Sequence, residues 1–354
     1  MDKNNGAIYD ARKLGKPKMI ILGVQHMFAM FGATILVPIL TGLDISTTLL
    51  MAGLGTLLFH CITKFKVPAF LGSSFAFLGG YAAIKAFSPN DPNSMLPYAC
   101  LGVACAGLIY FILAAVIKAV GIEKVMRFFP PVVTGPIIIA IGLGLAPSAV
   151  SNCTTNWFLA VVALAVIVVF NIWGKGMAKI IPIILGLLIS YGTGLVLYFI
   201  SQANPDLIQN VPWLFSGGAD ANGVYQPIFD FTSLNTICDN ISKGHIFGSE
   251  GLIGIPIHWD KTVFGGIDYS NGALIASSII AIVPIAFATM MEHIGDICAI
   301  SSTTGNNYIK DPGLHRTLVG DGLATTLASL FGGPANTTYG ENTGVLALTR
   351  VYDP

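Results

Sequence analysis

Long apolar runs, separated by shorter polar breaks, dominate the pattern along this chain. A helix needs roughly 20 apolar residues to cross the hydrocarbon core of a bilayer, and about ten runs approach that length. The pattern therefore predicts an all-α, multi-pass membrane protein. The runs cover residues 19–40, 47–63, 67–83, 96–120, 132–149, 157–173, 180–201, 272–293, 318–331 and 333–349.

Lysine and arginine are distributed unevenly among the polar breaks. If residues 1–18 stay in the cytoplasm and the runs alternate across the membrane, 15 of the 18 basic side chains fall on the inner side. Cytoplasmic loops retain positive charge, so we expect a protein of the cytoplasmic membrane with its N-terminus inside. Residues 202–271 form the one long polar insertion, which we interpret as an extracytoplasmic subdomain.

The composition agrees with this placement. Apolar residues make up 54% of the chain and charged residues 10%, against roughly 25% charged in average soluble domains, which argues against a soluble enzyme. Zero net charge gives no attraction to nucleic acid. Six cysteines without a CxxC pair indicate neither a zinc site nor a redox motif. Cys153 and Cys238 both fall outside, and the sequence leaves open whether they pair.

Two of the runs are interrupted by residues that break helices. Residues 68–80 read PAFLGSSFAFLGG and residues 332–344 read GGPANTTYGENTG. Each interruption falls in the third run of its half, and paired interruptions are typical of transporters built from inverted repeats, with the substrate near the midplane. Close helix packing at glycine is the alternative. Packing would explain a single glycine-rich run, but we favour a substrate site because the two interruptions fall at matching positions in the two halves.

Three carboxylates fall in or beside the predicted spans, where an acid is costly and therefore a functional candidate. Glu292 and Asp296 are four residues apart and share a helix face. Their mutual repulsion and lost hydration favour reversible proton binding; a helix-end ion pair is the alternative. Glu341 lies in the second interruption, as a ligand or as the cap of a half-helix. His26, beside Gln25, is more typical of an interior histidine than of a proton carrier, and Asp321 of a cap or interface residue.

Five motifs resemble the nucleobase-ascorbate transporter family, and within it the bacterial uracil permeases. They are LGVQHMFAMFGATILVPIL (22–40), PAFLGSSFAFLGG (68–80), MEHIGD (291–296), DPGLHR (311–316) and NTTYGENTGVLALTRVY (336–352). The resemblance implies fourteen spans in two inverted repeats of seven, arranged as core and gate domains and often dimeric. It also implies proton-coupled nucleobase uptake, with a short strand in each of the third and tenth spans.

Carried over to this chain, the resemblance assigns substrate binding to the side chains of Glu292 and Glu341 and to the backbone at Phe75 and Gly340. Tyr339 and Asn342 lie beside them, His26 and Gln25 support the site, and Glu292 with Asp296 couples the proton. Asp296 is a departure, because uracil permeases usually carry histidine there, and aspartate is more similar to the xanthine and urate carriers.

These observations predict a proton-coupled symporter that imports a nucleobase by alternating access. Uracil is the favoured substrate, and no cofactor is expected besides the proton as coupling ion. A xanthine or purine permease and an anion exchanger of the same architecture are the alternatives. An enzyme is not expected, since Glu292, His293 and Asp296 lie in one helical stretch and do not converge. We expect a cytoplasmic segment at 1–18, a first repeat at 19–201, the outer subdomain at 202–271 and three spans of a second repeat at 272–354. That repeat would extend to about residue 450, so the chain ending at Pro354 is expected not to transport alone.

Overall fold

The computed structural model is mostly helical and falls into two compact units, Met1–Ile141 with Pro256–Pro354, and Gly142–Ile255. It describes residues 7–121, 123–124, 127, 131–175, 178, 182–220, 222–232, 235, 238, 254 and 256–354. These two units are defined by which residues pack together, whereas the domains expected from the sequence are defined by the two inverted repeats. The repeat boundaries at residues 201 and 271 therefore remain predictions.

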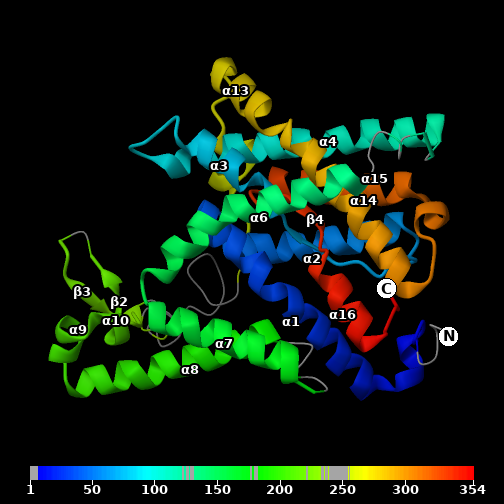
Figure 1. Ribbon diagram of the computed structural model, residues 1–354. Coiled ribbons are helices and arrows are strands. Elements are labelled where there is room, and N and C mark those ends of the chain that lie inside the picture. The colour runs from blue at the N-terminus through cyan, green and yellow to red at the C-terminus, as the bar shows by residue number, and fades with distance from the viewer. Residues whose placement is uncertain are drawn as a thin grey trace. The chain divides into compact units, whose positions relative to one another are not determined.

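The first unit combines long helices with two short strands that come from distant parts of the chain (Figure 1). Its α-helices are α1 (Lys16–Thr41), α2 (Ile45–Ile62), α3 (Leu78–Lys85), α4 (Leu96–Val120), α12 (Val263–Gly266), α13 (Gly272–Ile282), α14 (Ile285–Thr304), α15 (Leu314–Leu330) and α16 (Glu341–Thr349). Its strands are β1 (Leu71–Ser73) and β4 (Asn336–Thr338), and its short tight or wide turns of helix are η1 (Ala11–Leu14), η2 (Phe75–Phe77), η3 (Pro92–Met95), η5 (Trp259–Lys261) and η6 (Ile309–Gly313).

Helix α15 forms the centre of this unit, because it packs against both α4 and α2. Glycines allow its close approach to α4: a Cβ on Gly322 would lie 2.6 Å from the carbonyl oxygen of Gly107, and one on Gly107 would lie 2.7 Å from that of Gly322. Small residues at a crossing bring helix backbones together, as is common inside membranes. The largest fully buried side chains of this unit include Phe59, Tyr81, Tyr110 and Ile294.

Polar residues at the polar breaks fix where helices begin and end. The Asp44 carboxylate accepts from the Thr47 amide at 2.7 Å at the start of α2, and Asn271 accepts from the Leu274 amide at 3.2 Å at the start of α13. Gly42 ends α1 in the left-handed conformation, at φ 83°. These caps satisfy backbone groups that a helix end leaves without partners.

Four stretches of the described residues are long and apolar enough to cross a membrane, judged by length and composition: Ile45–Ile62, Pro92–Val120, Leu185–Ala203 and Gly272–Thr304. The boundary expected at residue 293 was wrong. The run beginning at Gly272 is interrupted at Pro284, where α13 gives way to α14, and α14 continues to a left-handed Gly305. Because proline lacks an amide hydrogen, it interrupts the helical ladder without ending the stretch.

The second unit contains α7 (Trp157–Trp173) packed along α8 (Pro182–Ala203), followed by α9 (Asp206–Asn210) and α10 (Pro212–Phe215). The division between the units falls within α6 (Pro131–Cys153). Strands β2 (Ser216–Ala219) and β3 (Tyr225–Pro227) form an antiparallel pair inside the polar insertion. The Asn156 side chain donates to the Ser216 carbonyl at 2.8 Å, which ties this pair to the start of α7. Cys153 and Cys238 are free thiols.

Candidate functional site

The two interrupted segments meet as a pair of antiparallel strands, β1 and β4. Leu71 lies opposite Thr338 and Ser73 opposite Asn336. The pairing extends beyond the strands, since the Tyr339 amide donates to the Phe70 carbonyl at 3.1 Å. Residues more than 260 positions apart in the sequence thus form one non-helical element, surrounded by helices α1, α2, α14 and α15 (Figure 1).

Side chains from the neighbouring helices hydrogen-bond to further backbone groups of this strand pair. Thr56 of α2 accepts from the Leu71 amide at 3.1 Å. On the other side, Asp321 of α15 accepts from the Thr338 amide at 2.8 Å, and Thr325 donates to the Asn336 carbonyl at 3.0 Å. Non-helical backbone persists at membrane depth only where protein or water satisfies it. Here protein side chains hold the broken segments in place.

Helix α14 presents Asp296 to this strand pair. Asp296 is buried, and its Oδ2 accepts from the Thr338 hydroxyl at 3.2 Å. Its Oδ1 lies 2.7 Å from where a Cβ on Gly340 would be, so only glycine fits there without a shift. Glu292 is half-buried one turn before Asp296. The structure therefore brings Asp296 and Gly340, which the sequence singled out separately, into direct contact.

Phe75 reaches the same region from the other interrupted segment. It opens the short helix η2, is half-buried, and its helix packs against α14. The Phe75 segment and the Gly340 backbone thus both pack against α14, the helix that carries Glu292.

Tyr339 connects three elements. Its hydroxyl donates to the Ser73 carbonyl at 3.0 Å and lies 3.3 Å from the Thr34 hydroxyl of α1. Its ring covers Gly72, where a Cβ would lie 2.3 Å from a ring carbon. These contacts join Tyr339 to α1 and β1 and make it a brace for the strand pair.

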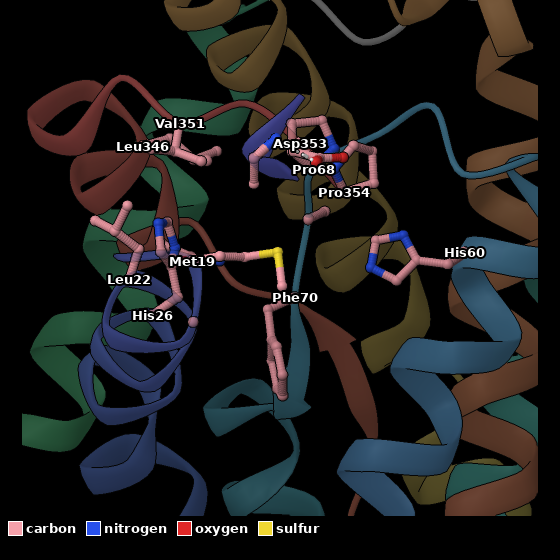
Figure 2. A pocket seen from close by; sticks show the side chains of 14 residues that line it. Met19, Leu22, His26, His60, Pro68, Phe70, Leu346, Val351, Asp353 and Pro354 are labelled. Carbon is pink, nitrogen blue, oxygen red and sulfur yellow. Dashed lines mark hydrogen bonds between the residues drawn. The ribbon is translucent and has the colours of Figure 1, made fainter. Parts of the chain in front are cut away.

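His26 and Asn342 line a separate cavity of about 300 Å³. Asn342 Oδ1 lies 3.2 Å from His26 Nδ1, and Thr349 Oγ1 lies 3.4 Å from His26 Nε2, so this histidine links α1 to α16. In Figure 2, His26 and His60 approach the cavity from opposite sides, with Phe70 between them. Glu292 and Gly340 are not among the lining residues. The predicted site residues therefore form two groups, one beside α14 and one around His26.

Two of the predicted residues have side chains outside the described part of the structure, Glu341 and Gln25. The backbone of Glu341 opens α16, directly after Gly340. The roles expected for these two side chains therefore remain predictions.

Sequence reasoning missed His293 as a site residue and underestimated Asp321. His293 is buried, with Nε2 3.0 Å from the Thr317 hydroxyl and Nδ1 3.1 Å from the Thr338 hydroxyl. Asp321 is fully buried, and its Oδ2 lies 3.3 Å from His293 Nδ1. The signals available in the sequence were Asp321, an acid between two glycines in the run 318–331, and His293, a histidine in the run 272–293. Within the described residues, no three His, Cys, Asp or Glu side chains are arranged to hold a metal ion.

Comparison with known proteins identifies the family. Residues 17–354 match the sequence profile described as "Permease family". The chain belongs to the nucleobase-ascorbate transporter family. It is 39% identical to the uracil permease of Bacillus caldolyticus over 344 residues, which is 94% of this chain and 67% of that protein. It is 37% identical to the uracil permease of Bacillus subtilis over 346 residues, 94% of this chain and 67% of the relative. Members of this transporter family are permeases, so the expectation that the protein is not an enzyme is confirmed.

Proposed function

We propose that this nucleobase-ascorbate transporter family member imports uracil together with a proton across the cytoplasmic membrane by alternating access. The observation that carries the proposal is the strand pair β1–β4 lying against the acid-bearing helix α14. The relatives that carry the name uracil permease support the choice of substrate. A multi-pass arrangement with the N-terminus inside, assembly as a homodimer and the 7+7 repeat belong to the same proposal.

Uracil presents two N–H donors and two carbonyl acceptors on a flat ring, so its site must alternate acceptors and donors beside an apolar wall. In the proposed site Glu292 and Glu341 accept from the ring N–H groups. Backbone amides near Phe75 and Gly340 donate to the carbonyls, and the Phe75 ring covers one face. A base that lacked one of these groups would leave a buried partner without a hydrogen bond, which is how polar sites reject analogues.

Proton coupling is assigned to Glu292, with Asp296 as its neighbour. Asp296 accepts from Thr338 and lies against Gly340 at the start of α16, where the helix N-terminus favours negative charge. In this proposal Glu292, alone or as a coupled pair with Asp296, takes up and releases the proton. Neutralising Glu292 lowers the cost of moving the loaded site through the bilayer.

Particular residues bear on the two alternative functions, a purine permease and an anion exchanger. Asp296 itself favours a xanthine or purine permease, because aspartate at this position is more similar to those carriers. An anion exchanger of the same architecture would require positive charge at the broken segments. The acidic Asp296 and Asp321 beside β4 argue against it.

A counterflow assay separates these functions. The native protein at its full natural length is reconstituted in liposomes loaded with unlabelled substrate, and entry of labelled uracil, xanthine and sulfate is measured with and without an inward proton gradient. We expect exchange of uracil and its accumulation only with the gradient. Faster exchange of xanthine would assign a purine permease, and exchange of sulfate alone would overturn the proposal.

A further inference from the structure

Helix α1 carries a proline in its interior, Pro38. Because proline has no amide hydrogen, Pro38 cannot donate the helical hydrogen bond to the carbonyl of Thr34, four residues earlier. A carbonyl that loses this donor at membrane depth needs another one from the protein, because hydrocarbon cannot donate a hydrogen bond. Thr34 is fully buried, so the replacement donor has to come from a neighbouring element.

Ser73 of β1 supplies this donor. Its hydroxyl donates to the Thr34 carbonyl at 3.1 Å, and both residues are buried. Serine and threonine hydroxyls commonly satisfy the backbone groups that proline frees in membrane helices. A hydroxyl has one hydrogen to donate, so this bond commits the Ser73 side chain to α1. Pro38 and Ser73 are therefore a matched pair, in which one residue leaves a carbonyl open and the other fills it.

Further contacts hold the same part of α1 against β1. The Tyr339 hydroxyl donates to the Ser73 carbonyl at 3.0 Å and lies 3.3 Å from Thr34 Oγ1. A Cβ on Gly72 would lie 2.9 Å from Thr34 Oγ1, so the helix and the strand approach closely there. Ser73 is thus bonded through its side chain to α1 and through its backbone to the residue that follows β4.

This connection lies next to the proposed uracil site. Ser73 ends β1, and Phe75 opens η2 two residues later. Between them, the Ser74 amide donates to the Ala335 carbonyl at 2.9 Å, which continues the contact with the second interrupted segment. The backbone at Phe75, which is proposed to donate to a uracil carbonyl, therefore takes its position from the place where Ser73 is fixed.

We propose that Ser73 is a positioning residue of the substrate site, which ties β1 to the carbonyl that Pro38 leaves open in α1 and so fixes the backbone at Phe75. The inference deepens the proposed function and rests on it for the effect on substrate affinity. The pairing of Ser73 with Pro38 does not depend on which base is carried.

A double-mutant cycle tests the pairing, with the protein at its full natural length in lipid nanodiscs. S73A leaves the buried Thr34 carbonyl without its donor, and we expect the thermal unfolding midpoint to fall by at least about 2 °C. P38A restores an amide hydrogen at position 38. The loss caused by S73A in the P38A background should therefore be less than about half as large, as coupled residues require.

Ser278 of α13 provides a matched control. Its buried hydroxyl also donates to a helix carbonyl, that of Leu274 at 2.9 Å, but the residue four positions after Leu274 is Ser278 itself and not a proline. S278A should therefore have the same effect with and without P38A. Equal losses from S73A in the two backgrounds would overturn the pairing. If S73A yields no folded protein, failure of P38A/S73A to restore folding would overturn it equally.

Transport kinetics distinguish positioning from stability. For the base that the counterflow assay identifies, S73A should raise KM about fivefold or more while the maximal rate changes by less than about twofold. P38A gives Thr34 a donor but does not reconnect α1 to β1. P38A/S73A should therefore regain stability yet keep a KM about fivefold above that of P38A.

Equal KM values for P38A and P38A/S73A would show that Ser73 only fills the gap left by proline, and would overturn the positioning role. Uptake of xanthine in place of uracil would refute the substrate of the proposed function, whereas the comparison of KM values would then be made with xanthine and would decide the inference in the same way.

Discussion

Gly340 lies so close to Asp296 that a side chain on it would displace the carboxylate. A Cβ there would be 2.7 Å from Asp296 Oδ1, while Asp296 Oδ2 accepts from Thr338. The start of α16 and the acidic face of α14 therefore fit together only through a residue without a side chain. This contact joins the second interrupted segment to the helix that carries Glu292.

Replacing Gly340 by alanine should impair transport more than stability. The added methyl group forces the Asp296 carboxylate to rotate away from Thr338, and the disturbed site should take up uracil about tenfold or more slowly, roughly 1.4 kcal/mol of lost transition-state stabilisation. Gly344, on the same helix, has open space around it, with no atom within 4 Å of where a Cβ would lie. G344A should therefore transport at about the native rate, within twofold. Equal uptake by G340A and G344A in cells would show that the contact with Asp296 has no functional role.

The crossing of α4 and α15 gives a prediction about stability. A Cβ on Gly322 would lie 2.6 Å from the Gly107 carbonyl oxygen, and backbone cannot rotate away as a side chain can. We expect G322A to lower the free energy of unfolding by about 1–3 kcal/mol, the usual cost of overpacking. Gly53 of α2 has open space around it, so G53A should be neutral or slightly stabilising. Thermal unfolding of the two variants in lipid nanodiscs would measure the difference. Similar unfolding midpoints for G322A and G53A would show that the close approach of α15 to α4 does not require glycine at position 322.

The segment before α1 is held against the segment after α16. The Ile8 amide donates to the Arg350 carbonyl at 2.8 Å, and the Tyr352 amide donates to the Ile8 carbonyl at 2.7 Å. The Tyr9 hydroxyl donates to the Thr304 carbonyl at 2.7 Å at the end of α14. Three elements far apart in sequence are thereby joined at one end of the first unit.

This arrangement predicts a pH effect at Tyr9. Partial burial, followed by the nearby Tyr352 and Tyr308, raises the pKa of the Tyr9 hydroxyl above its ordinary value. A raised pKa means that folding favours the neutral hydroxyl, so its contribution is complete below about pH 10 and is lost as the pH rises through the higher folded value. The native protein should therefore lose more stability than Y9F when the pH is raised above about 10. Parallel stability curves for the two proteins would exclude this role.

The sequence predicted those parts of the fold that depend on local pattern. Glycine and proline marked residues 68–80 and 332–344 as broken, and strands β1 and β4 lie within these segments. Asp296 was singled out because an acid in an apolar run is costly, and it is buried against Gly340.

Relationships between distant segments could not be predicted in the same way. Helical spacing places His293 away from the shared face of Glu292 and Asp296, and only the packing of α14 on β4 and α15 gives it Thr338, Thr317 and Asp321 as partners. Asp321 was interpreted as a cap or interface residue because nothing local indicates that its acceptor is needed by a strand 17 residues later. The register of β1 against β4, which creates that need, is a tertiary property.

The central claim is that Glu292 carries the proton that drives uracil accumulation. It is tested most directly by measuring uracil accumulation in proteoliposomes of the native protein and of E292Q, under an imposed inward proton gradient and over a range of external pH. We expect the native protein to accumulate uracil while the gradient lasts, and E292Q, which cannot ionise there, to show no accumulation driven by the gradient. Accumulation by E292Q against a gradient of uracil, with the pH dependence of the native protein, would contradict the claim.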